Sequence, residues 1–333
     1  MTTDSTEPVE SPRDIPLGRR VVMRYRRPEG QHPPLTDVIG ELVSLDPPTV
    51  LGGDGQAVAV PPDRVVALKA LGPRPIRTGE IRALEAAAAY GWPGIEHAWI
   101  DGWLARAGYG YTDRANSALP LGDSETPVPP GAITEQTLAR LREWYAVRRL
   151  PLRLALPDRL AKAPAGWRTR KETVVLGIDI ENFVLPQGPP MVRVFPAPTD
   201  AWLDLYHRKG EAEQTTIDLP PVPEVLTAVH DGELGFAALG VPQPIAVARG
   251  ALTTAPDGRR WIGLSCVAVS SEHRRHGLGA LVCAETLRWG RDRGATHAYA
   301  QVDADNEGAL ALYRDLGFVE HHHYRYTEPP PEA

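Results

Sequence analysis

The sequence contains 333 residues, of which 42% are hydrophobic and 23% charged, and its formal net charge is −6 at pH 7. This length and composition predict a soluble globular protein of two or three domains. The negative charge gives no general attraction to nucleic acid or to anionic membranes, so neither is expected as a partner.

The N-terminal residues 1–14 lack the basic start and the apolar segment of a signal peptide. No run of eighteen apolar residues occurs anywhere, and the two cysteines are too few for a disulfide framework. We therefore expect a cytoplasmic protein with reduced thiols, in which residues 1–14 and 328–333 are solvated tails.

Residues 15–72 contain five short β-rich runs separated by turn clusters such as GGDG. Runs of this length and spacing predict a small SH3-like β-barrel. Its role is expected to be structural or protein-contacting. The arginines near its start are most simply interpreted as a solvated strand face rather than a nucleic-acid site; they are Arg19, Arg20, Arg24, Arg26 and Arg27.

After an alanine-rich helix predicted over about 79–90, two stretches of the chain share one layout. Each has a helix containing one tryptophan, a basic turn, an apolar strand (152–156 and 298–302) and a Gly-aromatic pair that opens another strand. A repeated order of this kind predicts two copies of one α/β unit. We place a degenerate lobe at 73–184 and a catalytic lobe at 185–327.

The copies differ at the entry to the helix. The first has three prolines, which lack backbone N–H groups, whereas the second has SSEHRRHGLGA at 270–280 after a strand at 261–269. Gly277 and Gly279 remove side chains at the helix start, so that first-turn N–H groups can approach a phosphate closely. Arg274, Arg275 and His276 add cationic groups. The turn is therefore a candidate diphosphate site.

A Gly-x-Gly helix start is weak evidence alone, because tight packing also favours glycine. A Rossmann site would need a third glycine where Val282 stands, and a P-loop would need Gly-Lys-Ser or Gly-Lys-Thr. A second pattern strengthens the assignment: Asn306, Ala309 and Tyr313 share one face of a short helix. Taken singly, Asn306 could be a helix cap and Tyr313 a core-edge aromatic.

With both patterns, the sequence resembles the GNAT superfamily of N-acetyltransferases. The first motif of that family, V-x-P-x-x-R/Q-x-x-G-x-G/A, is matched by Val269, Arg274, Gly277 and Gly279, with Ser271 in place of proline. The second, N-x-x-A-x-x-x-Y-x-x-x-G-F, is matched from Asn306 to Phe318. The resemblance covers roughly 190–327. The whole chain is similar to an actinobacterial subgroup with an SH3-like N-terminal domain and two GNAT-like lobes, labelled histone acetyltransferase.

The resemblance implies an α/β GNAT acyltransferase fold and transfer of an acetyl group from acetyl-CoA to a primary amine. It also implies that strand residues 267–269, Val267 and Val269 among them, and Asn306 hold the pantetheine arm, and that Tyr313 is the general acid. The diphosphate would meet the amides from Arg275 to Ala280, with Arg274 closing the turn; the turn residues implied are Arg274, Arg275, His276, Gly277, Leu278, Gly279 and Ala280.

The general base and the acceptor remain open. The base candidates are Asp303, Glu272 and the histidines at 321–323, whose exposed or stacked state is the simpler interpretation, and no spacing indicates a metal site. Arg114, Asn116 and Ser117 are polar candidates for an acceptor pocket. The acceptor is either a protein lysine or a small-molecule amine. An acyl-CoA-binding regulator with weak catalysis is the alternative function.

Overall fold

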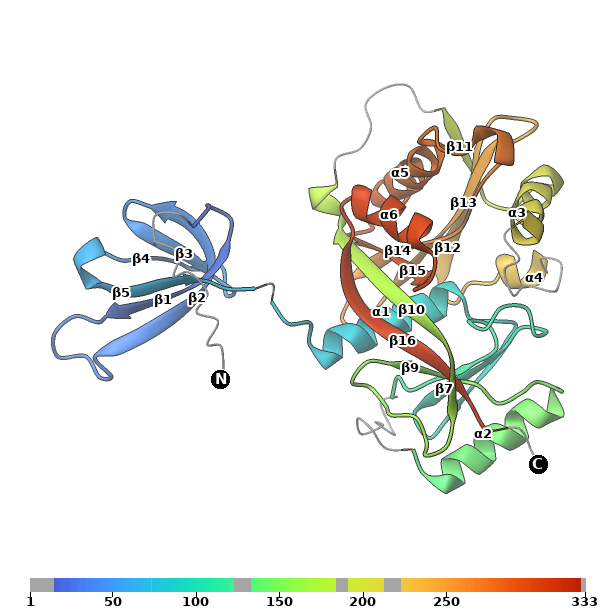
Figure 1. The fold of residues 1–333 in the computed structure, drawn as a ribbon, viewed down its shortest axis with the longest axis horizontal. Coiled ribbons are helices and arrows are strands. Elements are labelled where there is room, and N and C mark those ends of the chain that lie inside the picture. The colour runs from blue at the N-terminus through green and yellow to red at the C-terminus, as the bar shows by residue number, and fades with distance from the viewer. Residues whose placement is uncertain (1–14, 73, 123–132, 184–190, 213–222, 331–333) are drawn as a thin grey trace, which may run out of the picture. The chain divides into compact units, whose positions relative to one another are not determined.

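The computed structural model describes residues 15–72, 74–122, 133–183, 191–212 and 223–330 (Figure 1). The chain divides into two compact units between Pro75 and Ile76. The first unit is a five-stranded antiparallel sheet in the open order β4-β3-β2-β1-β5, which confirms five short strands. Its strands are β1 (Arg20–Arg26), β2 (Leu35–Leu45), β3 (Pro48–Gly52), β4 (Ala57–Ala59) and β5 (Val65–Ala70), with η1 (Pro62–Arg64) before β5. Val21, Met23, Leu42 and Val50 are fully buried and form its core.

The second unit is built on one sheet of eleven strands, in the order β11-β12-β13-β14-β15-β10-β16-β9-β8-β7-β6. Its first strands are β6 (Glu96–Ile100), β7 (Trp103–Ala107), β8 (Ala118–Leu119), β9 (Leu154–Pro157) and β10 (Arg168–Asp179). The remaining strands are β11 (Val192–Phe195), β12 (Gly232–Leu239), β13 (Ala246–Thr254), β14 (Arg260–Val269), β15 (His297–Asp303) and β16 (Val319–Glu328).

The helices of this unit are α1 (Thr78–Gly91), α2 (Glu135–Val147), α3 (Asp200–Ala212), α4 (Pro223–Leu226), α5 (Leu278–Arg291) and α6 (Glu307–Asp315). Short 3-10 turns are η2 (Ile180–Asn182) and η3 (Ser271–His273). Within the described ranges, no helix combines the length and apolarity needed to cross a bilayer. The alanine-rich helix predicted near 79–90 is α1. The strands predicted at 152–156, 261–269 and 298–302 are β9, β14 and β15.

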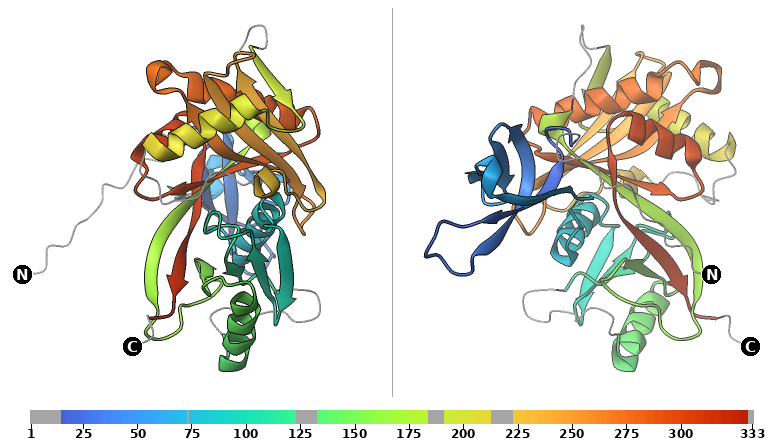
Figure 2. Two further views of the ribbon diagram at one scale, coloured as in Figure 1. Left: turned by 90° about the vertical axis from the view of Figure 1, so that its right-hand side faces the viewer. Right: turned by 60° about the vertical axis from the view of Figure 1, so that its left-hand side comes forward.

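The order of elements repeats within this unit. The series β6-β7-β8-α2-β9-β10 has the same order as β12-β13-β14-α5-β15-β16, and in each series a helix joins two parallel strands, β8 to β9 and β14 to β15. The last strand of each series pairs with the other one: β10 lies against β15, and β16 lies against β9. Figures 1 and 2 show β10 and β16 running side by side along their length. The two lobes thus exchange their final strands.

Side-chain alternation along β12 determines which helix covers which face of the sheet. Phe236 and Ala238 pack with α3, whereas Ala237 and Leu239 pack with Val282 of α5. The helix α1 packs on the α3 face, where its alanines allow close approach to Trp261 and Tyr299. Helices α5 and α6 cover the opposite face, so the sheet separates two layers of helices.

Candidate active site

The parallel strands β14 and β15 separate partway along their length. They pair only from Trp261 with His297 to Leu264 with Ala300. Just beyond this point β14 carries a bulge, because its register against β13 shifts between Val247 and Arg249, and Cys266 adopts a φ of 54°. A bulge bends a strand and increases its twist. The bend directs β14 away from β15 and opens the sheet.

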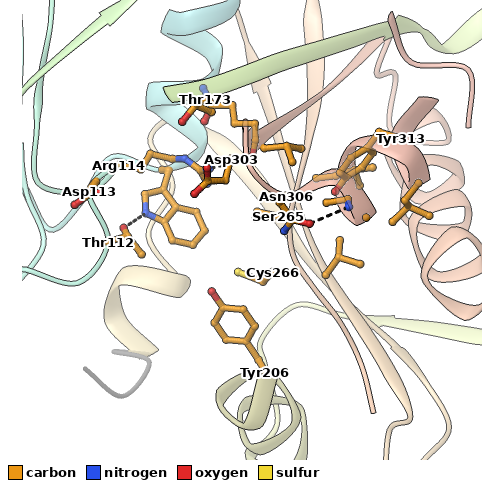
Figure 3. Close-up of a pocket in the computed structure, with 18 of the residues that line it drawn as sticks. Thr112, Asp113, Arg114, Thr173, Tyr206, Ser265, Cys266, Asp303, Asn306 and Tyr313 are labelled. Carbon is orange, nitrogen blue, oxygen red and sulfur yellow. Dashed lines mark hydrogen bonds between the residues drawn. The ribbon is translucent and has the colours of Figure 1, made fainter. Parts of the chain in front are cut away.

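A cavity of about 770 Å³ lies at this opening (Figure 3). Residues from both faces of the sheet line it: Gly279 and Tyr313 belong to the α5 and α6 layer, whereas Tyr206 belongs to α3. Figure 3 shows Tyr313 and Asn306 on one side of the cavity and Thr112, Asp113 and Arg114 on the other. Two molecules can therefore enter from opposite faces and meet inside the sheet.

The glycine turn forms one wall of this cavity. Gly277 is the N-cap of α5 with a φ of 74°, and Arg275 also has a positive φ of 64°. The helical hydrogen bonding begins at the Leu281 N–H, which donates to Gly277 O, so the three preceding amides lack an acceptor within the helix. Arg274 Nε donates to Val269 O at 3.4 Å, joining the turn to the end of β14.

Most residues that the sequence singled out for cofactor binding come together at this wall. Those that line the cavity are Val267, Val269, Arg274, Arg275, Gly279, Asn306 and Tyr313. His276, Gly277, Leu278 and Ala280 lie in the same turn but do not line it. A Cβ atom built on Gly277 would meet no atom within 4 Å, and one on Gly279 would lie 3.6 Å from Leu312 Cδ2. The space beside Gly277 is therefore open, whereas a side chain at Gly279 would touch Leu312 and Val269 at ordinary contact distance.

Asn306 is the N-cap of α6, as the simpler interpretation of its sequence position expected. Its Oδ1 accepts a hydrogen bond from the Ala309 N–H at 3.0 Å. This bond fixes the side chain and uses the oxygen, which leaves the Nδ2 amide as the group it can offer to a ligand in the cavity.

Tyr313 follows Asn306 by about two helical turns on the same face of α6, and its side chain is 5% exposed. Its ring packs against Phe318 with centroids 5.4 Å apart. Burial, together with the neighbouring Cys283 side chain, raises the pKa of Tyr313 well above its ordinary value. The phenol therefore keeps its proton at neutral pH and can only donate one to a stronger base.

The opposite wall contains residues that sequence reasoning missed. They come from α3, from the end of α1, from the loop between β7 and β8, from β15 and from the exchanged strands β10 and β16: Trp92, Tyr111, Tyr206, Lys171, Thr173, Gln301, Tyr324 and Tyr326. Arg114, a predicted acceptor-pocket residue, lies among them. Asn116 and Ser117 do not line the cavity: Asn116 bonds the backbone at Gly108, Gly110, Tyr111 and Thr112, and Ser117 accepts from Arg106.

Among the candidate bases, Asp303 lines the cavity and forms an ion pair with Lys171 at 2.6 Å. Glu272 lies in η3 and does not line it. The histidines lie along β16 outside the lining: His322 contacts Glu85 at 2.9 Å, and His323 contacts Glu172 at 2.6 Å and Glu320 at 2.8 Å. The strand's alternation places His322 on the buried face.

The His321 side chain makes folding stability pH-dependent. Burial lowers the pKa of His321 to about 4, with smaller contributions in the same direction from His322, Arg259 and Arg159, and only Glu80 opposes the shift. Below pH 6.5 the His321 side chain takes up a proton in the unfolded chain but stays neutral in the folded chain until the pH approaches 4. The free energy of unfolding is therefore unaffected by His321 above pH 6.5 and decreases as the pH falls from 6.5 toward 4.

Compared with His321→Gln, the wild-type protein should therefore lose up to about 3 kcal/mol more stability between pH 6.5 and pH 4. Urea unfolding at several pH values measures the difference. His323, whose pKa is raised because Glu172 and Glu320 outweigh its burial, remains in both proteins and cancels. Identical pH profiles for the two proteins would contradict the assignment.

In the described ranges, no group of three His, Cys, Asp or Glu side chains is placed to hold a metal ion. Cys266, expected to be a buried thiol without chemistry, lines the cavity and is only partly buried, whereas Cys283 is buried. Burial raises the pKa of the Cys266 thiol, with Arg249 opposing the shift. Cys266 is therefore protonated at neutral pH and a poor nucleophile.

Comparisons with known proteins agree with this geometry. Residues 78–327 match the family model described as "Probable histone acetyltransferase Rv0428c C-terminal", and residues 15–69 match "Rv0428c N-terminal Sm-like domain". The small β-domain is therefore of the Sm-like kind, which is roughly similar to the SH3-like domain expected.

The chain is 43% identical to "Probable histone acetyltransferase Rv0428c" of Mycobacterium tuberculosis, over 93% of this chain and 94% of the relative. It is 28% identical to "Uncharacterized N-acetyltransferase YobR" of Bacillus subtilis, over 74% of this chain and 98% of that protein. A solved GCN5-related N-acetyltransferase from Kribbella flavida matches 76% of this chain and 96% of its own, with 19% identity and a TM-score of 0.49.

Proposed function

Because the chain belongs to the Rv0428c-like family of GNAT-type N-acetyltransferases, we propose that it transfers the acetyl group of acetyl-CoA to a primary amine. The observation that carries the proposal is the single cavity that joins the glycine turn to Tyr313 across the opening between β14 and β15. Donors for a diphosphate and a proton donor for a thiolate face the same space.

The residues of the turn fit the donor substrate. The amides of Leu278, Gly279 and Ala280 offer N–H groups at the positive end of α5, and Arg274 and Arg275 supply positive charge for the phosphates. Beyond Leu264, β14 no longer pairs with β15, so the edge that it turns toward the cavity, from Val267 to Val269, can meet an amide-containing arm. Asn306 lines the same cavity and offers its Nδ2 amide.

In the proposed reaction the neutral amine nitrogen attacks the thioester carbonyl carbon. The new C–N bond forms, the C–S bond breaks, and the departing sulfur takes the phenolic proton of Tyr313. A buried phenol that stays protonated at neutral pH is available as a proton donor while negative charge develops on the departing sulfur. The proton lost by the amine passes to a base or to water; of the candidate bases, Asp303 lines the cavity and the others do not.

A thiol-release assay with acetyl-CoA and a panel of amines tests the proposal. We expect amine-dependent release of free CoA and formation of the acetylated amine. Saturable binding of CoA without release in the presence of any amine would instead support the acyl-CoA-binding regulator.

The variant Gly279→Asp tests the diphosphate site, and Gly279→Ala is its matched control. A Cβ at this position meets Leu312 only at ordinary contact distance, and the motif accepts alanine here, so Gly279→Ala should keep both the fold and CoA binding. A carboxylate in the first turn of a helix is also compatible with the fold, but it would repel the phosphates, so the affinity of Gly279→Asp for CoA should fall. Equal CoA affinity in the two variants would count against this turn as the binding site.

A further inference from the structure

Three arginines lie around the wall opposite the glycine turn: Arg106 and Arg249 are buried and fully engaged by the protein, and Arg114 is partly buried. Arg249 donates to the backbone oxygens of Leu226, Gly91 and Ala228, and Arg106 donates to those of Ser117 and Trp92. Both are under 5% exposed and hold loops together. These hydrogen bonds to backbone oxygens explain why the fold contains two buried positive charges.

The third, Arg114, is different. Its guanidinium group donates from Nη2 to Gln301 O at 3.4 Å and interacts with the Tyr324 side chain, whereas its buried Nε has no hydrogen-bond partner among the described residues. Its guanidinium lies over the Trp92 ring, 5.4 Å from the centroid. A buried donor without an acceptor destabilises a protein unless a ligand or water satisfies it.

The position of Arg114 is fixed by the loop between β7 and β8. Asn116 holds this loop through bonds to the N–H groups of Gly108 and Gly110 and to the oxygens of Tyr111 and Thr112. The loop therefore presents Arg114 to the cavity as a preorganised group rather than as a mobile surface side chain.

The acidic residues around this wall already have partners. Asp113 is paired with Arg153 at 2.6 Å, and Asp303 is paired with Lys171 at 2.6 Å. Glu85 shares a void of about 10 Å³ with Arg114, but its Oε1 contacts His322 and accepts from Gln301. Within the described part of the chain, no carboxylate forms an ion pair with Arg114, so the wall has an uncompensated positive charge.

Arg114 also lies close to the reacting centre. With Leu264, Ser265 and Gln301 it lines a small void at the point where β14 and β15 separate. The same point faces the cavity in which the acetyl group is to be transferred. An anionic group bound by Arg114 would therefore lie near the attacking amine, as two groups of one small molecule do.

From this placement we propose that the acceptor is an α-amino acid, with its α-carboxylate bound by Arg114 while its α-amine is acetylated. A guanidinium group matches a carboxylate in shape and charge. The remaining wall is aromatic and suits an apolar side chain; its residues are Trp92, Tyr111, Tyr206, Tyr324 and Tyr326. A lysine-rich protein segment would place a second cation beside Arg114, which disfavours it.

This inference rests on the proposed acetyl transfer and gives it a substrate class. The α-amine forms a bond to the acetyl carbon, the C–S bond of the thioester breaks, Tyr313 protonates the sulfur, and the net proton of the ammonium group leaves to solvent. The products are an N-acetyl amino acid and CoA.

The test compares three acceptors that differ only at the carboxylate: phenylalanine, phenylalaninamide and phenethylamine, with a lysine-rich peptide as a fourth. Thiol release is measured with acetyl-CoA, and kcat/KM is expressed per unprotonated amine. We expect phenylalanine to exceed both uncharged analogues by roughly 10- to 100-fold, the effect of a charge-assisted contact.

The variant Arg114→Gln should lower kcat/KM for phenylalanine by the same factor and leave the uncharged amines nearly unchanged, whereas Arg114→Lys should retain part of the preference. Arg168→Gln, at an exposed arginine outside the cavity, is the control. Should Arg114→Gln fail to fold, calorimetric titration of wild-type protein with phenylalanine and with phenethylamine, both in the presence of CoA, gives the same comparison.

Equal kcat/KM for phenylalanine and phenethylamine, a preference for the lysine-rich peptide, or an equal loss with all amines in Arg114→Gln would overturn the inference while leaving acetyl transfer intact. The absence of thiol release with every amine would instead overturn the proposed function. The two failures are therefore distinguishable.

Discussion

Replacing Tyr313 by phenylalanine is expected to lower kcat for acetyl transfer by roughly 100- to 10,000-fold, the range of general acid catalysis. The change removes the phenolic oxygen and keeps the ring that packs against Phe318. Equilibrium binding of CoA should be unchanged, because the glycine turn and Asn306 are not altered. Steady-state thiol release and calorimetric CoA titration measure the two quantities separately.

Tyr109→Phe provides the comparison for this variant, since Tyr109 is 62% exposed and does not line the cavity. A Tyr313→Phe enzyme with wild-type kcat, or one whose loss follows entirely from weaker CoA binding, would remove the phenol from the reaction. Because the pKa of Tyr313 is raised above its ordinary value of 10.0, wild-type activity should show no loss through phenol ionisation below pH 10.

Replacing Arg249 by methionine is expected to destabilise the second unit by about 3–5 kcal/mol, as when one partner of a buried charged network is removed. Arg249 is 1% exposed and donates to Leu226 O at 2.7 Å, Gly91 O at 2.9 Å and Ala228 O at 3.0 Å. Methionine has similar length but would leave all three backbone oxygens without this donor.

Thermal unfolding measures this effect, which corresponds to a fall in Tm of roughly 10 °C for a unit of this size. Arg193→Met, at an exposed position on β11, is the control and should unfold at the wild-type temperature. If the Arg249→Met protein also unfolded near that temperature, the bonds from Arg249 would contribute little to the fold.

The sequence could bring together the residues of the glycine-turn wall, which we propose holds the acyl donor, because local backbone requirements define this wall. Gly277 occupies a left-handed conformation at a helix start, and the spacing of Asn306 and Tyr313 places both on one face of α6. Each of these two patterns lies within a short, continuous stretch of the sequence. Periodicity and turn chemistry report such short-range features directly.

The acceptor wall was only partly predictable. Arg114 was singled out, but Asn116 and Ser117 proved to stabilise the loop that carries it. Tyr206 reaches the cavity from α3, and Lys171 reaches it from β10, far from the motifs in sequence. Nothing in the local pattern of either segment encodes pairing between strands over a hundred residues apart.

The exchange of β10 and β16 has a consequence for how this enzyme could be divided or recombined. A fragment starting after β10 would leave β15 unpaired along one edge and β16 without either of its partners, β10 and β9, and such exposed strands invite association with other chains. Neither half is therefore a self-sufficient module. Gene fusion or domain transfer would have to move residues 76–330 together, so that both walls of the cavity travel in one piece.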